Sequence, residues 1–163
     1  MPELISPTSA LQAAWREAHA EWGPGLHEDG FGLLPGDDAG TPEGFEAWLQ
    51  RLAGDTGCTY RWIVEDGAVL GGIGLRYGEG EAVRRSGNIG YGIRPSKRCR
   101  GYGVWALRAM LAEARHEGLA QVLVICAADN AASARTIERA GGVPQDTDAG
   151  DGGRLLRYLI ATG

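Results

Sequence analysis

A strand, a basic turn and a helix follow one another between residues 88 and 117, and this succession constrains the fold more than any other feature of the sequence. Residues 88–94 alternate apolar and small side chains, which is typical of a strand, and Pro95 ends it. Four of the 16 Lys and Arg residues of the chain fall within residues 94–100. Residues 103–117 then carry apolar side chains at helical spacing. A basic turn that leads from a strand into a helix predicts an α/β protein with an anion site at the start of the helix.

The rest of the chain predicts further helices and strands around this segment. Helical spacing and capping residues predict three more helices, over residues 8–22, 42–53 and 131–140. Alternating side chains on both sides of a turn at Glu65, Asp66 and Gly67 predict an antiparallel hairpin. The hairpin strands span residues 60–64 and 69–77, and later strands span residues 122–127 and 154–160. The first of these later strands is continuously apolar, as in a buried parallel strand, so we expect a mixed sheet.

Length and composition favour one domain. A chain of 163 residues with 44% hydrophobic residues is large enough for one sizeable core. Its longest apolar run, residues 122–128, is far shorter than the ~20 residues that cross a bilayer. The first residues lack a secretory pattern, so we expect a cytoplasmic protein without a membrane segment. The 3 cysteines form no CxxC pair, so we expect neither disulfides nor a metal site.

Residues 98–104 have the composition of a phosphate-binding turn. Backbone amides at a helix N-terminus and flanking arginines both bind phosphate, and glycines let phosphate approach the backbone. A solvated basic turn is the alternative. A Walker loop is excluded, because no Lys followed by Ser or Thr comes after Gly103. The dinucleotide-binding pattern of a dehydrogenase would use Gly101, Gly103 and Ala106, but the strand then ends too early and too little chain remains for the other strands.

Six residues of this turn fit a known pattern. They are Arg98, Cys99, Arg100, Gly101, Tyr102 and Gly103. The pattern is Arg or Gln, two residues, Gly, one residue, and Gly or Ala, which is the acetyl-CoA signature of the GNAT (Gcn5-related N-acetyltransferase) superfamily. Residues 58–160 resemble this superfamily in the order of their elements, and they are most similar to a bacterial branch of predicted acetyltransferases.

The resemblance implies a single-domain α/β fold, in which a mixed central sheet contains a splayed strand pair and is flanked by helices. Residues 1–57 would form the acceptor-side helices and loop. Residues 58–160 would form the sheet and the acetyl-CoA-binding core. The implied activity is that of an N-acetyltransferase, with acetyl-CoA as the acyl donor, no metal, and direct attack by a primary amine in a ternary complex.

The resemblance also implies the residues that bind acetyl-CoA. The pantetheine arm would contact the backbone of Ile93 and Arg94 and lie beside Asn130 and Ser133. The pyrophosphate would be held by Arg98, Cys99, Arg100, Gly101, Tyr102, Gly103 and Val104. A plain helix cap is the alternative role for Asn130, and both roles are compatible.

Acetyl transfer also needs a base for the amine, a donor for the oxyanion and an acid for the leaving thiolate. The backbone N–H of Ile93 is the expected oxyanion donor. Relatives carry a tyrosine acid where this chain has Ile137, and a glutamate where it has Asn88, which could still position a water. The acid would then be Tyr91 or Tyr158. The candidate bases are the carboxylates of Glu28, Asp29, Glu65 and Glu79.

The distribution of charge bears on the acceptor. Residues 1–81 carry 14 acidic residues against 4 arginines, a net charge of −10, whereas residues 82–163 carry a net charge of +5. An acidic acceptor side would attract a cation, so we expect a small cationic amine such as a polyamine, a basic amino acid or an aminoglycoside-like antibiotic. A solvated acidic surface is the alternative. Nucleic acid is not expected, because the basic residues cluster in one loop and the total charge is −5.

The sequence leaves a second function class open and gives an expectation for the assembly. Because the usual tyrosine and glutamate are missing, an acyl-CoA sensor or binding module that has lost catalysis is the alternative to an enzyme. A homodimer is the expected assembly if exposed tryptophans and the last strand pair with a second copy.

Overall fold

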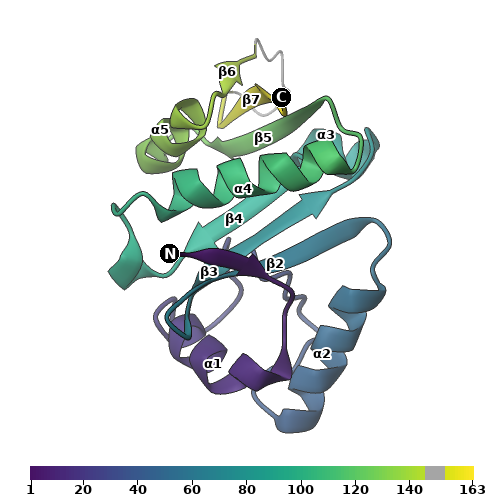
Figure 1. Cartoon of the computed structure of the whole chain (residues 1–163), viewed down its shortest axis with the longest axis vertical. Helices are drawn as coiled ribbons and strands as arrows, with labels where there is room; N and C mark the ends of the chain where they lie inside the picture. Colours follow the sequence, from purple (N-terminus) through teal and green to yellow (C-terminus); the bar gives the residue numbers. More distant parts are fainter. Residues whose placement is uncertain (146–152) are drawn as a thin grey trace. The chain divides into compact units, whose positions relative to one another are not determined.

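The computed structural model describes residues 1–145 and 153–163. Helices and strands follow one another along these residues (Figure 1). The strands are β1 (Glu3–Ile5), β2 (Cys58–Glu65), β3 (Ala68–Arg76), β4 (Ile89–Ile93), β5 (Gln121–Ala127), β6 (Val143–Pro144) and β7 (Leu155–Ala161). The α-helices are α1 (Gln12–Ala20), α2 (Pro42–Gly54), α3 (Glu81–Ser86), α4 (Tyr102–His116) and α5 (Ala131–Arg139). Short 3-10 helices span Ser9–Leu11 and Pro95–Lys97.

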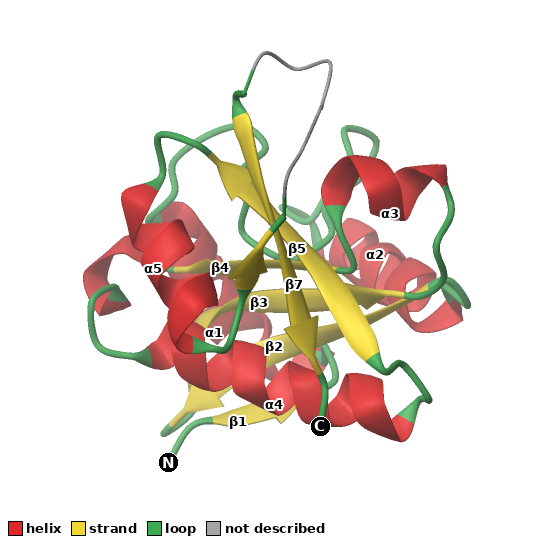
Figure 2. Ribbon diagram, turned by 90° about the horizontal axis from the view of Figure 1, so that it is seen from above, coloured by secondary structure: helices red, strands yellow, loops and turns green. Residues whose placement is uncertain are grey.

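The strands form one mixed sheet. Their order is β1-β2-β3-β4-β5-β7-β6. β1 is antiparallel to β2, whereas β4 is parallel to β5, with Ile89 opposite Val124. β7 lies beside β5 and runs in the opposite direction (Figure 2), with Tyr158 opposite Val124. The predicted α/β class with a mixed sheet is therefore confirmed.

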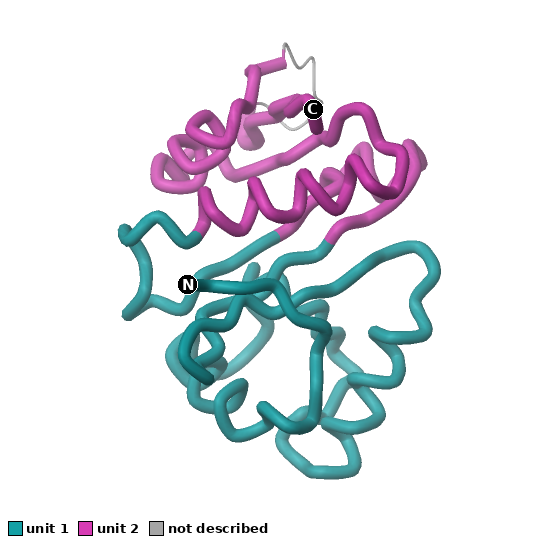
Figure 3. Tube along the Cα trace, viewed as in Figure 1, with its two compact units in different colours: residues 1–74, 91–102 teal, residues 75–90, 103–163 magenta. Residues whose placement is uncertain are grey.

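The chain divides into two compact units (Figure 3). The first unit contains Met1–Gly74 and Tyr91–Tyr102, and the second contains Leu75–Gly90 and Gly103–Gly163. β3 and β4 each contribute residues to both units. The division of a single domain at residue 57 stays a prediction.

Aromatic side chains fill the core of the first unit. The buried face of α1 carries Trp15, and that of α2 carries Trp48, with the two ring centroids 4.9 Å apart. Trp15, Trp48 and Trp62 are each exposed by no more than 1%. We use the name aromatic cluster for five of these buried side chains, which are Trp15, Phe31, Phe45, Trp48 and Trp62. The expectation that exposed tryptophans pair two copies is wrong for these three residues, because they form the core.

Local signals explain the elements that the sequence predicted in the first unit. The Thr41 hydroxyl caps α2 by accepting a hydrogen bond from the Gly44 amide, at 3.0 Å. Asp66 and Gly67 both have positive φ, of 52° and 77°, which is the geometry of a tight turn between antiparallel strands. The turn therefore joins β2 to β3 as predicted.

The second unit has an aliphatic core. α4 begins one residue before its predicted start and buries Ala106, Leu107, Met110, Leu111 and Ala114. α5 is capped by Asn130 and buries Ile137 completely. α3 is a helix that the sequence patterns do not predict, and only Val83 among its six residues is buried. Among the described residues, no helix has the length and apolar character needed to cross a membrane.

Candidate functional site

The turn between β4 and α4 combines exposed basic residues with unusual backbone geometry. After the 3-10 helix, Cys99 and Gly101 have φ angles of 61° and 84°. The left-handed conformation is easily adopted by glycine but is uncommon for cysteine. α4 starts at Tyr102, so the amides of its first turn, including Gly103 and Val104, have no carbonyl four residues earlier within the helix. Such amides are suited to bind an anion.

The basic side chains of this turn fall into two groups. Arg98 and Arg100 are exposed, and Nε of Arg98 donates to the carbonyl oxygen of Ile93 at 2.9 Å. This hydrogen bond holds the Nε atom of Arg98 against the end of β4. Arg94 is only 6% exposed and points elsewhere. Arg98 and Arg100 are therefore the arginines available to an anion at the turn.

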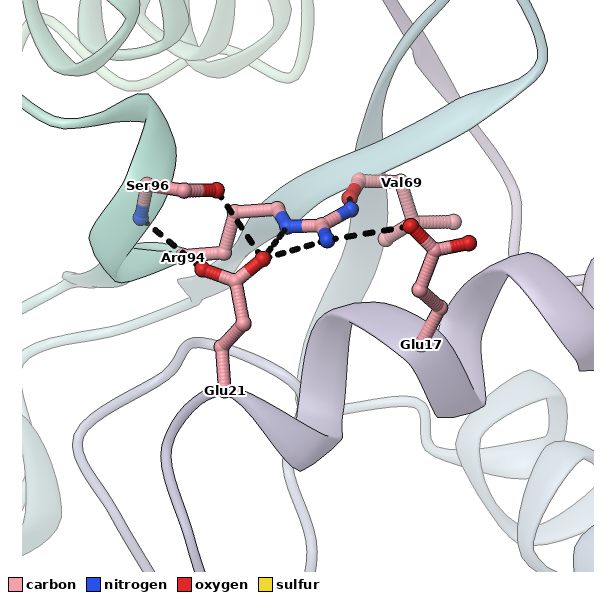
Figure 4. Close-up of polar contacts among 5 residues, drawn as sticks. All are labelled: Glu17, Glu21, Val69, Arg94 and Ser96. Atoms are coloured by element: carbon pink, nitrogen blue, oxygen red, sulfur yellow. Dashed lines mark hydrogen bonds and ion pairs between the residues drawn. The ribbon is translucent and has the colours of Figure 1, made fainter.

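Arg94 reaches α1 instead, as Figure 4 shows. Its Nε donates to Oε2 of Glu21 at 2.5 Å, and its Nη2 pairs with both Glu21 and Glu17. Its Nη1 donates to the carbonyl oxygen of Val69 at 3.2 Å. The Ser96 amide donates to Oε1 of Glu21 at 2.8 Å, and the Ser96 hydroxyl donates to Oε2 at 2.9 Å. We call Glu17, Glu21, Arg94 and Ser96 the Arg94 cluster.

The pKa of Glu21 reflects these contacts. Loss of solvent contact acts to raise it, but hydrogen bonds from Ser96 and Arg94 outweigh this effect and lower the pKa below its ordinary value. Glu21 is therefore ionised at neutral pH and balances the charge of Arg94. No local pattern in the sequence marks Glu21 or Ser96 as site residues.

The backbone of Arg94 is also occupied. Its amide donates to the carbonyl oxygen of Leu70 on β3 at 2.7 Å, and its own carbonyl accepts from the Lys97 amide at 2.9 Å. A carbonyl oxygen has a second lone pair, so the proposed contact of Arg94 with pantetheine stays a prediction for that atom alone.

Backbone hydrogen bonds join β4 to β3. The Arg94–Leu70 bond and the bond from the Arg76 amide to the Asn88 carbonyl join the two ends of β4 to β3. Residues that face a partner alternate along an antiparallel strand, so we expect the backbone of Tyr91 and Ile93 to face the opposite edge. The amide expected to hold the oxyanion belongs to this set.

The glycine-rich loop between α1 and α2 lies against this part of β4. A Cβ atom at Gly92 would lie 2.5 Å from Cα of Asp29 and 2.6 Å from the carbonyl oxygen of Glu28. The Gly72 amide of β3 donates to the Asp29 carbonyl at 3.2 Å. Glycine at both positions lets the loop backbone approach the strands. Glu28 and Asp29 are therefore next to Gly92, one residue before Ile93.

Asp29 differs from Glu28 in its surroundings. Asp29 is 3% exposed and its Oδ1 accepts a hydrogen bond from the Phe31 amide at 3.0 Å, whereas Glu28 is exposed. Burial raises the pKa of Asp29, against the opposing influence of that hydrogen bond and of His19 and His27. A carboxylate with a raised pKa accepts a proton from an amine more readily than an ordinary one.

His19 lies on α1 and interacts electrostatically with Asp29. Its ring stacks on Trp15, with centroids 4.6 Å apart. Burial lowers the pKa of His19, although Asp29 acts to raise it. Within the described residues, its Nδ1 atom has no hydrogen-bond partner. His19 is therefore a second titratable group beside Asp29, and no local sequence pattern marks it as such.

Asn88 has all its side-chain groups engaged. It is 6% exposed, its Oδ1 accepts from the Leu123 amide at 2.8 Å, and its Nδ2 donates to the carbonyls of Arg76 at 2.9 Å and Gly78 at 3.3 Å. These bonds join the end of β3 to β5. The geometry is that of a structural residue, and a catalytic role for Asn88 stays a prediction.

The remaining candidates lie elsewhere in the fold. Asn130 caps α5, and its Oδ1 accepts from the Ser133 amide at 3.1 Å. Ile137 packs in the core of the second unit. The Tyr158 hydroxyl donates to Oε1 of Glu138 at 2.9 Å, and burial together with this bond raises the pKa of Tyr158 to about 12. The roles of Asn130 and Ser133 in cofactor binding and of Tyr158 as an acid stay predictions.

The carboxylates of the hairpin are unlike the pair in the loop. Glu65 accepts a hydrogen bond from the Tyr102 hydroxyl at 2.6 Å and pairs with the N-terminal ammonium group at 3.5 Å. The bond from Tyr102 lowers the pKa of Glu65. Glu79 is exposed in the segment after β3. Among the described residues, no three His, Cys, Asp or Glu side chains gather as a metal site.

Comparison with known proteins supports a common fold. The chain is similar in structure to spermidine N-acetyltransferase from Vibrio cholerae, solved with CoA and spermine, at 14% identity and a TM-score of 0.70, over 99% of this chain and 95% of that one. It is also similar to the Salmonella typhimurium acetyltransferase that modifies the N-terminal serine of ribosomal protein L7/L12, at 15% identity and a TM-score of 0.68, over 98% and 94% of the two chains.

A third similar structure contains the acyl donor. It is the microcin C7 self-immunity acetyltransferase MccE with acetyl-CoA and AMP, at 13% identity and a TM-score of 0.68, over 98% of this chain and 92% of that one. No curated protein sequence matches the chain significantly.

The sequence itself matches a family model. The model describes an acetyltransferase (GNAT) domain and matches residues 17–143, which is more than three quarters of the chain. The dehydrogenase alternative is therefore wrong, whereas the binding of acetyl-CoA by the basic turn stays a prediction. The chain belongs to the GNAT family of N-acetyltransferases, which use acetyl-CoA as the acyl donor.

Proposed function

We propose that this acetyltransferase transfers the acetyl group to a primary amine of a small cationic acceptor, by direct attack in a ternary complex. The observation that carries the proposal is the position of Glu28 and Asp29 against Gly92 of β4. Two acidic residues whose backbone lies against the strand that is expected to hold the acetyl group favour a positively charged acceptor.

The two carboxyl groups have different roles in this proposal. Glu28 is exposed and attracts the ammonium group of the acceptor. Asp29 is buried with a raised pKa and takes the proton that the amine must lose. An alkyl ammonium group has a pKa of ~10.4, so this loss needs assistance at neutral pH.

The transfer then follows from the backbone of β4. The neutral amine nitrogen attacks the thioester carbonyl carbon, and the Ile93 amide donates to the developing oxyanion. The attack forms the carbon–nitrogen bond, and collapse of the adduct breaks the carbon–sulfur bond while the nitrogen gives its extra proton to the departing thiolate. The CoA thiolate leaves with a pKa of ~8.5 and takes up a proton, so it needs less help than the amine. No covalent enzyme intermediate is required.

In this proposal CoA binds at the turn between β4 and α4. The exposed Arg98 and Arg100 and the first-turn amides of α4 hold the diphosphate. The proposal also includes Asn130 and Ser133, as residues that lie beside the pantetheine arm.

An acetylation screen tests the acceptor class. Purified protein is incubated with acetyl-CoA and with spermidine, lysine, an aminoglycoside, or a neutral-side-chain peptide that has an N-terminal serine, and release of free CoA is measured. We expect the polycations to give the highest kcat/KM. Faster reaction with the serine peptide would contradict a cationic acceptor, and no release with any amine would favour the acyl-CoA-binding module.

A further inference from the structure

The Arg94 cluster places a carboxylate next to a turn that binds an anion. Glu21 contacts Ser96, which lies two residues before Arg98. An unpaired carboxylate here would repel the diphosphate of CoA. Glu21 is paired instead, because Arg94 donates to it from two nitrogens. The negative charge of Glu21 is thus balanced before any ligand arrives.

The contacts of Glu21 are directional. Oε1 takes the Ser96 amide, and Oε2 takes both the Ser96 hydroxyl and the Arg94 guanidinium. The Glu21 side chain is 24% exposed and that of Arg94 is 7% exposed. Ser96 itself is exposed, so its position depends on two hydrogen bonds to a carboxylate, which are stronger than bonds between neutral groups. Ser96 is therefore fixed in both backbone and side chain.

A second carboxylate holds the other end of the turn. The Tyr102 hydroxyl, at the first residue of α4, donates to Oε1 of Glu65 at 2.6 Å. Glu65 is balanced by the N-terminal ammonium group. The exposed residues 98–101 thus lie between two anchored positions, Ser96 and Tyr102, in the first unit.

We propose that Glu21 is a positioning residue for CoA: through Ser96 and Arg94 it fixes the turn 95–101 so that Arg98 and the following amides meet the diphosphate. This inference rests on the proposed use of that turn. Glu21 does not touch the cofactor. It reduces the entropy that the turn would otherwise lose when it binds CoA.

Glu17 provides a matched control. It contacts the same Arg94 nitrogen at 3.3 Å from the same helix, but its side chain is 75% exposed and it has no contact with Ser96 among the described residues. An exposed ion pair contributes little. Removal of Glu17 therefore changes the charge near Arg94 without releasing the turn.

Calorimetric titration with CoA tests the proposal on the full chain. We expect Glu21→Ala to raise the Kd for CoA by about tenfold, because at least one further residue must be ordered on binding. Glu21→Gln, which keeps an oxygen for Ser96, has a smaller effect, and Glu17→Gln stays within about twofold of the unchanged protein. A Glu21→Ala protein that binds CoA as tightly as the unchanged one would overturn the inference.

Hydrogen exchange measured by mass spectrometry separates positioning from general destabilisation. Without ligand, Glu21→Ala should speed exchange in residues 95–102 and leave α2 and β2 unchanged. Faster exchange throughout the first unit would show a general structural role and contradict the proposal. If the unchanged protein gives no heat with CoA, the proposed function of the turn fails instead.

Discussion

Helix α1 is held by two regions of opposite character, and their difference separates stability from geometry. On one face Trp15 joins the aromatic cluster, in which the indole N–H groups of Trp15, Trp48 and Trp62 lack hydrogen-bond partners within the described residues. At its C-terminal end Glu21 joins the Arg94 cluster, in which charged groups pair with one another.

The two regions contribute energy in different ways. Each large aromatic residue buries about 150–250 Å² of surface. The free energy gained by this burial exceeds the roughly 1–3 kcal/mol that a buried N–H group without a partner costs. A partly buried ion cluster contributes little net energy, because desolvation offsets attraction, but its hydrogen bonds fix the direction of the groups that they join. The aromatic cluster should therefore set the stability of the first unit, and the Arg94 cluster the shape of the turn.

Removal of an aromatic ring should produce the largest effect. We expect Trp15→Ala to lower the free energy of unfolding by about 3–5 kcal/mol, because it leaves a cavity among four other rings. Urea denaturation measures this loss. Trp22→Ala, at the partly buried edge of the same core, serves as the control. A larger loss from Trp22→Ala than from Trp15→Ala would contradict the assignment of the core.

Replacement of Arg94 should cost less stability but more CoA affinity. Arg94→Met leaves Glu21 without its counter-charge and the Val69 carbonyl without its donor, which we expect to cost about 2–3 kcal/mol, since Glu21 keeps some contact with water. The double variant Arg94→Met with Glu21→Gln should recover part of this stability, because no unpaired charge remains. It should not recover CoA affinity. Recovery of both would remove the distinction between the two regions.

Asn88 extends the comparison to a neutral polar residue in the second unit. Asn88→Ala should lower the free energy of unfolding by about 1–2 kcal/mol, because the Leu123 amide and the Arg76 carbonyl lose their partners. The isosteric Asn88→Asp should also destabilise, since a carboxylate would then face two carbonyl oxygens. The rate of CoA release per folded molecule should not change. A loss of rate at unchanged stability would instead show a catalytic role for Asn88.

The smallest effect concerns pH and the His19–Asp29 pair, which borders the aromatic cluster. Folding lowers the pKa of His19 from 6.5, so the unfolded chain binds its proton more strongly and stability falls as the pH falls below that value. Folding raises the pKa of Asp29 from 3.8, so its contribution to stability falls as the pH rises through the raised pKa. His27 is the other titratable group that acts on this pair, and it lowers the pKa of both His19 and Asp29.

Two variants separate these contributions. His19→Phe keeps a ring against Trp15 and should remove the loss below pH 6.5, which we expect to be under about 1 kcal/mol because His19 is partly exposed. Asp29→Asn keeps an oxygen for the Phe31 amide and should be at least as stable as the unchanged protein at neutral pH. Thermal unfolding across pH measures both. A steeper acid loss in His19→Phe would contradict the direction of the shift.

Local features of the fold could be predicted from the sequence, and distant pairings could not. The cap at Thr41 and the turn at Asp66 and Gly67 each depend on a few neighbouring residues, so the sequence shows them. β1 has only three residues and is a strand because it pairs with Trp62–Val64 of β2, which no local pattern indicates.

The site shows the same limit. The basic turn is a continuous stretch of sequence, so its composition alone predicts an anion site. The Arg94 cluster joins residues more than seventy positions apart, and Glu21 has an ordinary helical position in the sequence. Glu28 and Asp29 were identified as carboxylates of a glycine-rich loop, but only the close approach at Gly92 shows where that loop lies.

Cys99, whose backbone is in the left-handed conformation, gives the turn a thiol that can be labelled. It is exposed, whereas Cys58 and Cys126 are buried. A maleimide fluorophore should therefore label the protein at this thiol alone and leave the cores intact. Its emission would report ligand occupancy in real time, and shielding of the unlabelled thiol by CoA would give a footprint that requires no knowledge of the acceptor.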